Sequence, residues 1–233
     1  MRRCGSGIFA TVYAGGFYSV LNTELPQNRL QTTVSVLNPK VIVTSESLLE
    51  TAKEYFSERK IVTFEDLAKS EPDYAKLGEI RSHKIDTDPL YINFTSGSTG
   101  TPKGIVVCHR SVIDFIDHFT EIFGIDNNDV IANQAPFDFD VSVKDIYSAV
   151  KTGATLVVVP RRMFSAPAEL IDFICDRRIT VMIWAVSALC LISTFHALDY
   201  RTPETVNKIL FSGELCRSRR LKISVHIFQM QSM

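Results

Sequence analysis

Short apolar segments alternate with segments of helical periodicity along most of this chain of 233 residues. Residues 154–159 have the continuous apolar character of a buried strand, whereas 111–123 carry apolar side chains at helical spacing. We predict strands at 41–43, 61–62, 90–94, 104–107, 130–131, 154–159, 180–184 and 208–211, and helices at 46–59, 64–69, 111–123, 141–150, 168–178 and 187–195. This alternation predicts an α/β fold of mostly parallel sheets flanked by helices.

The charge balance and the apolar runs exclude two classes of partner. Lys and Arg together number 25 and Asp and Glu number 26, so the net charge is -1 and no general affinity for nucleic acid is expected. A membrane-spanning helix needs about 20 apolar residues. The longest run here, 181–192, is shorter. We therefore expect no nucleic acid and no membrane among the partners.

Five cysteines are spaced without a CxxC pair and without a metal-ligand pattern shared with histidine. Their odd number and apolar surroundings are typical of reduced thiols that pack in a core. We therefore expect a cytoplasmic protein with no protein-bound metal.

A loop rich in hydroxyl groups and glycine, TSGSTGTPKG at 95–104, follows the strand predicted at 90–94. Glycine lets the backbone N–H groups approach a ligand, hydroxyls donate to phosphate oxygens, and Lys103 adds a positive charge. The spacing differs from a Walker A loop, because Lys103 is followed by Gly104 and a strand. A flexible linker is the alternative, but linkers rarely join two buried strands. The pattern favours a phosphate site.

This loop resembles the signature of the adenylate-forming, or AMP-binding, enzymes. Similar stretches occur at 12–17, at 133–147 and at 211–214, and the resemblance covers roughly residues 11–214. The run 133–147 is similar to the D-alanine:carrier-protein ligases, and Phe139-Asp140-Val141-Ser142 is similar to a motif of the amino-acid adenylation domains of nonribosomal peptide synthetases.

The resemblance implies roles for particular residues. The loop would hold the β and γ phosphates of ATP, with Lys103 and His109 as catalytic residues; His109 lies in a Cys-His-Arg stretch where the family has Thr-His-Arg. The implied nucleotide-binding residues are Thr95, Ser96, Gly97, Ser98, Thr99, Gly100, Thr101 and Lys103.

Asp140 is implied to hold the α-ammonium group of an amino acid substrate. A cation that enters a partly buried pocket needs a partner of opposite charge. The alternative role for Asp140 is capping of the helix that follows. Lys144 would line the pocket and favour an acidic substrate side chain, or fold back onto Asp140, or be an exposed lysine. Val141, Ser212 and Gly213 complete the implied substrate site, whereas Trp184 fits the core better.

The family reaction joins a substrate carboxylate to the α-phosphorus of ATP with Mg²⁺ and passes the acyl group to the thiol of a phosphopantetheinyl carrier protein. The resemblance implies this chemistry for an amino acid. An acyl-CoA-type ligase fragment and an inactive remnant that binds phosphate weakly are the alternatives. The Asn-x-Tyr-Gly-Pro-Thr-Glu motif and the family's C-terminal domain are absent from the sequence, so we expect the chain alone to be inactive or nearly so.

We expect residues 1–214 to form a partial AMP-binding core, with a polar linker or surface crossing near 71–89. Residues 215–233 begin with a burst of basic residues, and the stretch 223–228 alternates with no evident partner. We interpret this end as a truncated or frame-shifted product; a basic terminal tail is the alternative.

Overall fold

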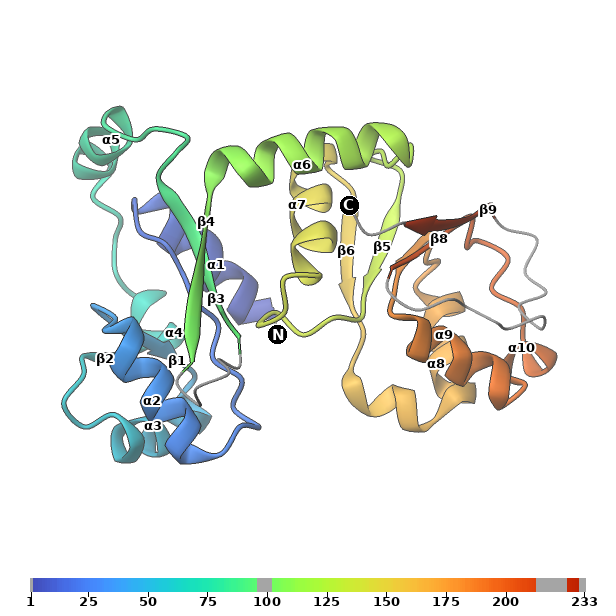
Figure 1. Ribbon diagram of the computed structural model, residues 1–233, viewed down its shortest axis with the longest axis horizontal. Coiled ribbons are helices and arrows are strands. Elements are labelled where there is room, and N and C mark those ends of the chain that lie inside the picture. Colours follow the sequence, from blue (N-terminus) through green and yellow to red (C-terminus); the bar gives the residue numbers. More distant parts are fainter. Residues whose placement is uncertain (1, 96–101, 213–225, 231–233) are drawn as a thin grey trace. The chain divides into compact units, whose positions relative to one another are not determined.

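The computed structural model of the chain describes residues 2–95, 102–212 and 226–230. The chain divides into two compact units, Met1–Ser111 and Val112–Met233. The elements of both units are labelled in Figure 1.

The first unit contains five α-helices, one 3₁₀-helix and four strands among its described residues. They are α1 (Arg2–Tyr13), α2 (Gln27–Leu37), β1 (Ile42–Thr44), η1 (Glu46–Leu48), α3 (Leu49–Tyr55), β2 (Ile61–Thr63), α4 (Phe64–Leu67), α5 (Tyr74–Ser82), β3 (Pro89–Thr95) and β4 (Lys103–Cys108). Strands β1 and β2 form a parallel pair, and β3 and β4 form an antiparallel hairpin. The hairpin is an exception to the mostly parallel pairing that the sequence predicts.

The sequence pattern did not predict three helices of this unit. Helices α1 and α2 were not predicted, and α5 lies inside the stretch 71–89 that we expected to be a linker or surface crossing. Asp73 caps α5 by accepting a hydrogen bond from the Lys76 N–H at 3.0 Å. No residue of α5 is buried, so this helix lacks the apolar stripe by which a helix is recognised.

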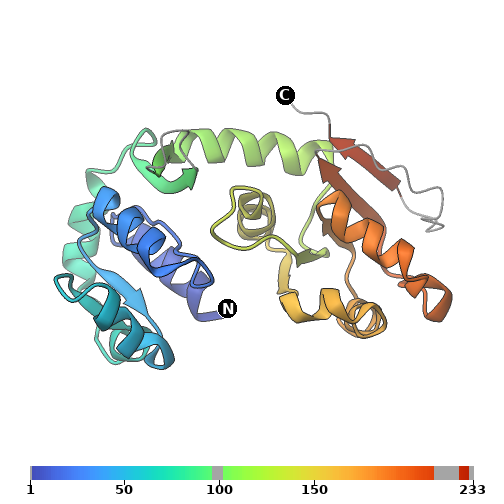
Figure 2. The ribbon, with the colours of Figure 1, turned by 60° about the horizontal axis from the view of Figure 1, so that its bottom comes forward.

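The second unit is built on one parallel sheet with the strand order β6-β5-β7-β8-β9. Its elements are α6 (His109–Ile122, which begins in the first unit), β5 (Val130–Asn133), α7 (Ser142–Thr152), β6 (Thr155–Val158), η2 (Arg161–Ser165), α8 (Pro167–Asp176), β7 (Val181–Ile183), α9 (Val186–Thr194), α10 (Ala197–Tyr200), β8 (Lys208–Ser212) and β9 (His226–Met230). Figure 2 shows helices on both sides of this sheet.

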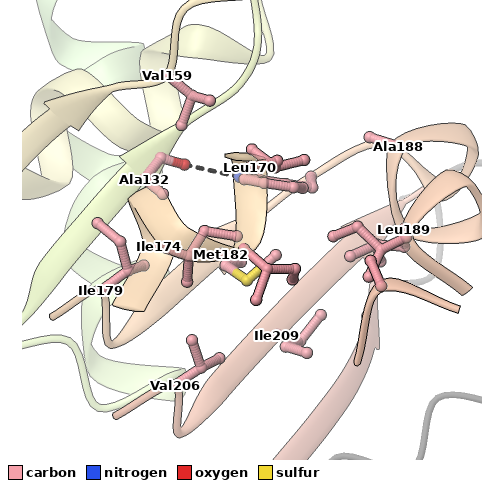
Figure 3. Packing of buried hydrophobic residues seen from close by; sticks show 14 of the residues in the cluster. Ala132, Val159, Leu170, Ile174, Ile179, Met182, Ala188, Leu189, Val206 and Ile209 are labelled. Carbon is pink, nitrogen blue, oxygen red and sulfur yellow. Dashed lines mark hydrogen bonds between the residues drawn. The ribbon is translucent and has the colours of Figure 1, made fainter. Parts of the chain in front are cut away.

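Alternate residues of the strands face two separate apolar clusters. Ala132, Met182 and Ile209 pack with α8 and α9, and this cluster includes Leu170, Ile174 and Leu189 (Figure 3). Their neighbours Ile131, Val181, Ile183 and Leu210 pack with Phe119 of α6 and Ala149 of α7. Because side chains alternate along a strand, two covered faces require strands that are apolar at nearly every position.

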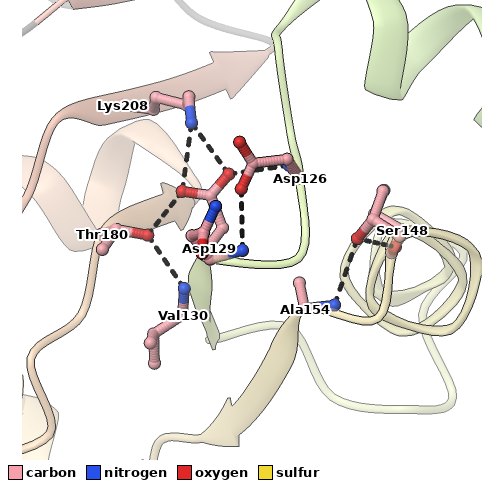
Figure 4. Close-up of polar contacts among 9 residues, drawn as sticks. Asp126, Asp129, Val130, Ser148, Ala154, Thr180 and Lys208 are labelled. Atoms are coloured by element: carbon pink, nitrogen blue, oxygen red, sulfur yellow. Dashed lines mark hydrogen bonds and ion pairs between the residues drawn. The ribbon is translucent and has the colours of Figure 1, made fainter.

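A partly buried ion pair lies where the polypeptide enters three of these strands (Figure 4). Lys208 Nζ lies 2.8 and 3.0 Å from the two carboxylate oxygens of Asp129, and the Thr180 hydroxyl donates to the same carboxylate at 2.7 Å. Burial would raise the pKa of Asp129, but hydrogen bonds from Lys208, the Asp126 N–H and Thr180 outweigh burial and lower it. This cluster therefore fastens the amino-terminal ends of β5, β7 and β8 together.

Strand β9 corrects one expectation. The sequence showed no partner for the alternating residues near the end of the chain, but His226–Met230 pairs in parallel with β8, from Lys208↔His226 to Ser212↔Met230. The edge of a sheet presents unpaired N–H and C=O groups, and β9 pairs with those of β8.

Candidate functional site

The β3–β4 hairpin carries the segment that the sequence marks as a phosphate loop. Thr95 is the last residue of β3, Lys103 is the first of β4, and the two are paired across the hairpin. Both side chains are exposed, whereas Pro102 beside Lys103 is buried. The strand pairing thus places Thr95 and Lys103 opposite each other, with their side chains on the same face at one end of the hairpin.

The predicted phosphate-binding residues between these two positions, Ser96, Gly97, Ser98, Thr99, Gly100 and Thr101, lie outside the described residues. Their roles stay predictions. Gly104, which follows Lys103, has a structural reason of its own: a Cβ there would lie 3.0 Å from Ile92 Cγ2 and 3.4 Å from the Phe94 ring.

His109 lies at the first position of α6, directly after β4. Its Nε2 is buried and has no hydrogen-bond partner among the described residues. Burial lowers the pKa of His109, Lys84 lowers it further, and Asp88 opposes the shift. The imidazole is therefore neutral at pH 7 and keeps one ring nitrogen available for a hydrogen bond.

An ion pair and a main-chain hydrogen bond anchor the chain around His109. The guanidinium of Arg110 donates to both carboxylate oxygens of Asp86 at 2.8 and 2.7 Å, and the His109 N–H donates to the Asp88 main-chain oxygen at 3.1 Å. The segment before β3 and the start of α6 are thereby held together, which fixes the backbone of His109.

A second group of predicted residues lies at the carboxyl-terminal edge of the parallel sheet in the second unit. Strand β5 ends at Asn133, the segment 134–141 follows, and β8 ends at Ser212. Strand β7 separates β5 from β8, so these two strands lie about 10 Å apart. Ligands of open parallel sheets bind outside this edge.

Within the segment 134–141, Asp140 is exposed and Val141 is half-buried. The N-cap of α7 is Val141, and no side chain makes a cap hydrogen bond there. In the described part of the chain, Asp140 contributes only its main-chain oxygen to the start of α7, where it accepts from the Val143 N–H at 3.0 Å. The structure therefore does not support the capping role, and the Asp140 carboxylate has no ion-pair partner among residues 2–95, 102–212 and 226–230, so it can pair with a cation from outside the chain.

Lys144 lies one helical turn after Asp140 and is half-buried, not fully exposed. Burial lowers its pKa, and the nearby carboxylates of Asp145 and Asp140 oppose the shift. Lys144 forms no ion pair with any of the described residues, so the ammonium group does not fold back onto Asp140. Its preference for an acidic substrate stays a prediction.

The positions that remain are Ser212, Gly213 and Trp184. Ser212 is the last residue of β8, and its main chain pairs with Met230, but its side chain lies outside the described residues, as does the whole of Gly213. Trp184 is 1% exposed, and its Nε1–H donates to the Ala132 main-chain oxygen at 2.8 Å. Trp184 therefore belongs to the core, as its sequence context favours.

A buried polar pair behind this segment was not predicted. Asn133 Nδ2 donates to Asp145 Oδ2 at 2.7 Å and to the Ala135 main-chain oxygen at 3.0 Å. Burial raises the pKa of Asp145 to about 8, although the Asn133 hydrogen bond and Lys144 oppose the shift. The sequence feature that could have revealed this pair is the position of Asp145 on the apolar face of a helix, between Val143 and Ile146.

Comparison with known proteins identifies the family to which a chain with this arrangement belongs. The family model described as "AMP-binding enzyme" matches residues 6–226. The chain belongs to the AMP-binding enzyme family. The D-alanine--D-alanyl carrier protein ligase of Staphylococcus aureus is 29% identical over 224 residues, which are 95% of this chain and 44% of that protein. The chain thus spans less than half the length of the curated relatives it matches.

Solved structures of AMP-binding enzymes share the fold. The N-terminal subdomain of Klebsiella oxytoca NpsA, in complex with 3-hydroxyanthranilyl-AMSN, has a TM-score of 0.75 at 18% identity over 100% of this chain and 57% of that one. The nonribosomal peptide synthetase FmoA3 with α-methyl-L-serine-AMP bound has a TM-score of 0.77 at 20% identity, over 92% of this chain and 23% of that one. VinN with L-aspartate has a TM-score of 0.75 at 16% identity, over 92% and 54%.

These similarities confirm the predicted fold class, an α/β fold that makes up part of the core of an adenylate-forming enzyme. Within the described part of the chain, each helix is too short or too polar to cross a bilayer.

Proposed function

We propose that this AMP-binding chain is part of an ATP-dependent ligase that activates the carboxylate of an amino acid as an aminoacyl-adenylate. The observation that carries the proposal is the open Asp140 carboxylate at the carboxyl-terminal edge of the sheet, in a chain that belongs to the AMP-binding enzymes. A carboxylate in this place provides an electrostatic partner for an α-ammonium group, which plain carboxylic acids lack.

The β3–β4 hairpin would bind the nucleotide. Lys103 and Thr95 would bind the phosphates of ATP, and the loop between them would add backbone and hydroxyl donors. The substrate carboxylate attacks the α-phosphorus, and pyrophosphate leaves. Because the substrate itself is the nucleophile, the protein needs only to position the reactants and to neutralise the phosphate charge.

Magnesium fits this proposal as a companion of the nucleotide. Among the described residues no three His, Cys, Asp or Glu side chains are grouped as metal ligands, so the ion would be held mainly through phosphate oxygens. His109 follows the other end of β4, about 20 Å along the strand from Lys103, so its free ring nitrogen would not reach the phosphates held at the Thr95–Lys103 end.

A carrier-protein thiol is the proposed acceptor of the activated amino acid. The support is the similarity to the D-alanine--D-alanyl carrier protein ligase of Staphylococcus aureus. The thiol on a phosphopantetheine arm would displace AMP and form a thioester. Lys144, half-buried beside Asp140, would favour a substrate with an acidic side chain.

Replacement of Lys103 by alanine is expected to weaken ATP binding by the chain about 10- to 100-fold, because a charged hydrogen-bond donor to phosphate is lost. Titration calorimetry with ATP and Mg²⁺ measures the dissociation constant. Lys76→Ala is the matched control, since Lys76 is exposed on α5 and its removal changes the net charge equally. Equal ATP affinity in all three proteins, or no ATP binding by the wild-type chain, would contradict the proposed nucleotide site.

A further inference from the structure

Two polar side-chain atoms on α7 are buried and lack partners among the described residues. They are Asp145 Oδ1 and Ser148 Oγ, and both residues are 0% exposed. The main-chain oxygen of Ser148 accepts from Thr152 Oγ1 at 2.8 Å (Figure 4), but this bond leaves the side-chain hydroxyl unpaired. Two unpaired buried groups within one helical turn need an explanation, because each one costs about 1–3 kcal/mol.

The spacing of the two groups suits a bridging molecule. Residues three apart on a helix share a face, with Cβ atoms about 5–6 Å apart. The two oxygens make no direct hydrogen bond, but each can reach a small molecule placed between them. The face concerned is the one that meets β5, since Asp145 also contacts Asn133 there.

The chemistry of the pair selects a neutral occupant. Asp145 Oδ2 already accepts from Asn133, and burial keeps the carboxyl protonated at neutral pH, so Oδ1 is free to donate a hydrogen bond. The serine hydroxyl can donate or accept. A cation would need a carboxylate charge, and Lys144 beside Asp145 already adds a positive charge. Water accepts from one group and donates to the other.

We propose that Asp145 Oδ1 and Ser148 Oγ hold one buried water molecule on the face of α7 that packs against β5. The water completes the hydrogen bonds that link α7 to the end of β5, through Asp145 and Asn133. This site goes beyond the proposed function and does not depend on it.

Ser148→Ala separates a hydrated site from a dry one by the sign of its effect. With water bound, the variant removes one partner of the water and is expected to raise the equilibrium constant of unfolding about five-fold. In a dry site the variant would remove an unpaired hydroxyl and stabilise the protein. Urea denaturation followed by the fluorescence of Trp184, the single tryptophan, measures the constant in this unit.

Ser187→Ala is the matched control, because Ser187 is exposed on α9 and reports the effect of a serine-to-alanine change on a helix without a buried partner. A crystal structure of the chain with a water oxygen about 2.7–3.2 Å from both atoms would support the proposal. A Ser148→Ala protein as stable as the control, or more stable, would overturn it. An empty gap or a direct Asp145–Ser148 hydrogen bond in the crystal would do the same.

Discussion

Replacement of Asp129 by alanine is expected to lower the free energy of unfolding of the second unit by about 3–5 kcal/mol. The Asp129 and Lys208 side chains are only 5% and 19% exposed, so the variant leaves a largely buried ammonium group without its partner. The Thr180 hydroxyl and the Asp126 N–H lose their acceptor as well. Chemical denaturation followed by Trp184 fluorescence measures the change, because this tryptophan lies in the core of the same unit.

An exposed ion pair of the same unit is the control. Asp176 lies 3.0 Å from Arg201, is 66% exposed, and leaves Arg201 paired with Asp172 when it is removed. Asp176→Ala is therefore expected to cost less than about 1 kcal/mol. Similar losses for the two variants would show that the Asp129–Lys208 pair contributes no more than a surface pair.

The second large effect is a dependence of stability on pH that comes from Asp145. Burial raises the pKa of this carboxyl to about 8 in the folded protein, above its ordinary value near 4 when unfolded. Between these two values only the folded state holds the proton. The stabilisation that comes from protonated Asp145 is therefore complete below the unfolded pKa. It falls by about 1.4 kcal/mol per pH unit between the unfolded and the folded pKa, and it is lost once the pH has risen through the folded pKa.

Asp145→Asn tests this dependence, because an amide oxygen can still accept from Asn133 but does not titrate. The free energy of unfolding is measured for both proteins from pH 5 to pH 8. As pH rises, the wild type is expected to lose free energy of unfolding relative to Asp145→Asn. Asp176→Asn is the control for an aspartate-to-asparagine change at an exposed position. Parallel curves for wild type and Asp145→Asn would show that the buried carboxyl does not hold its proton.

The strands β5 to β8 and the helices α6 to α9 of the second unit were predictable because their apolar residues face a sheet covered on both sides. Strand β6 and helix α6 follow their sequence patterns within a few residues. Helix α5 was not predictable in this way, since its stability comes from the Asp73 cap and not from a buried stripe. Strand β9 depends on a partner far away in the sequence, which a local pattern does not reveal.

In the candidate site, too, some residues were predictable from the local sequence, whereas the roles of others depend on partners elsewhere in the chain. Lys103 and Thr95 were identified from a loop whose composition serves phosphate binding, and their pairing follows from the hairpin. The role of Asp145 depends on Asn133, twelve residues earlier, and on complete burial, neither of which is visible from the residues alone. The Asp129–Lys208 pair joins residues 79 positions apart in the sequence and follows only from the parallel order of β5, β7 and β8.

The most direct test of the amino acid site is the binding of a stable aminoacyl-adenylate analogue and of its counterpart without the α-amino group. The two compounds differ only in the group that Asp140 is proposed to hold, and binding does not require turnover. Titration calorimetry with the chain, over a panel of side chains, is expected to show one amino compound that binds at least ten-fold more tightly than its counterpart, and Asp140→Ala is expected to abolish the difference. Equal affinity of the wild-type chain for both members of every pair would contradict the account.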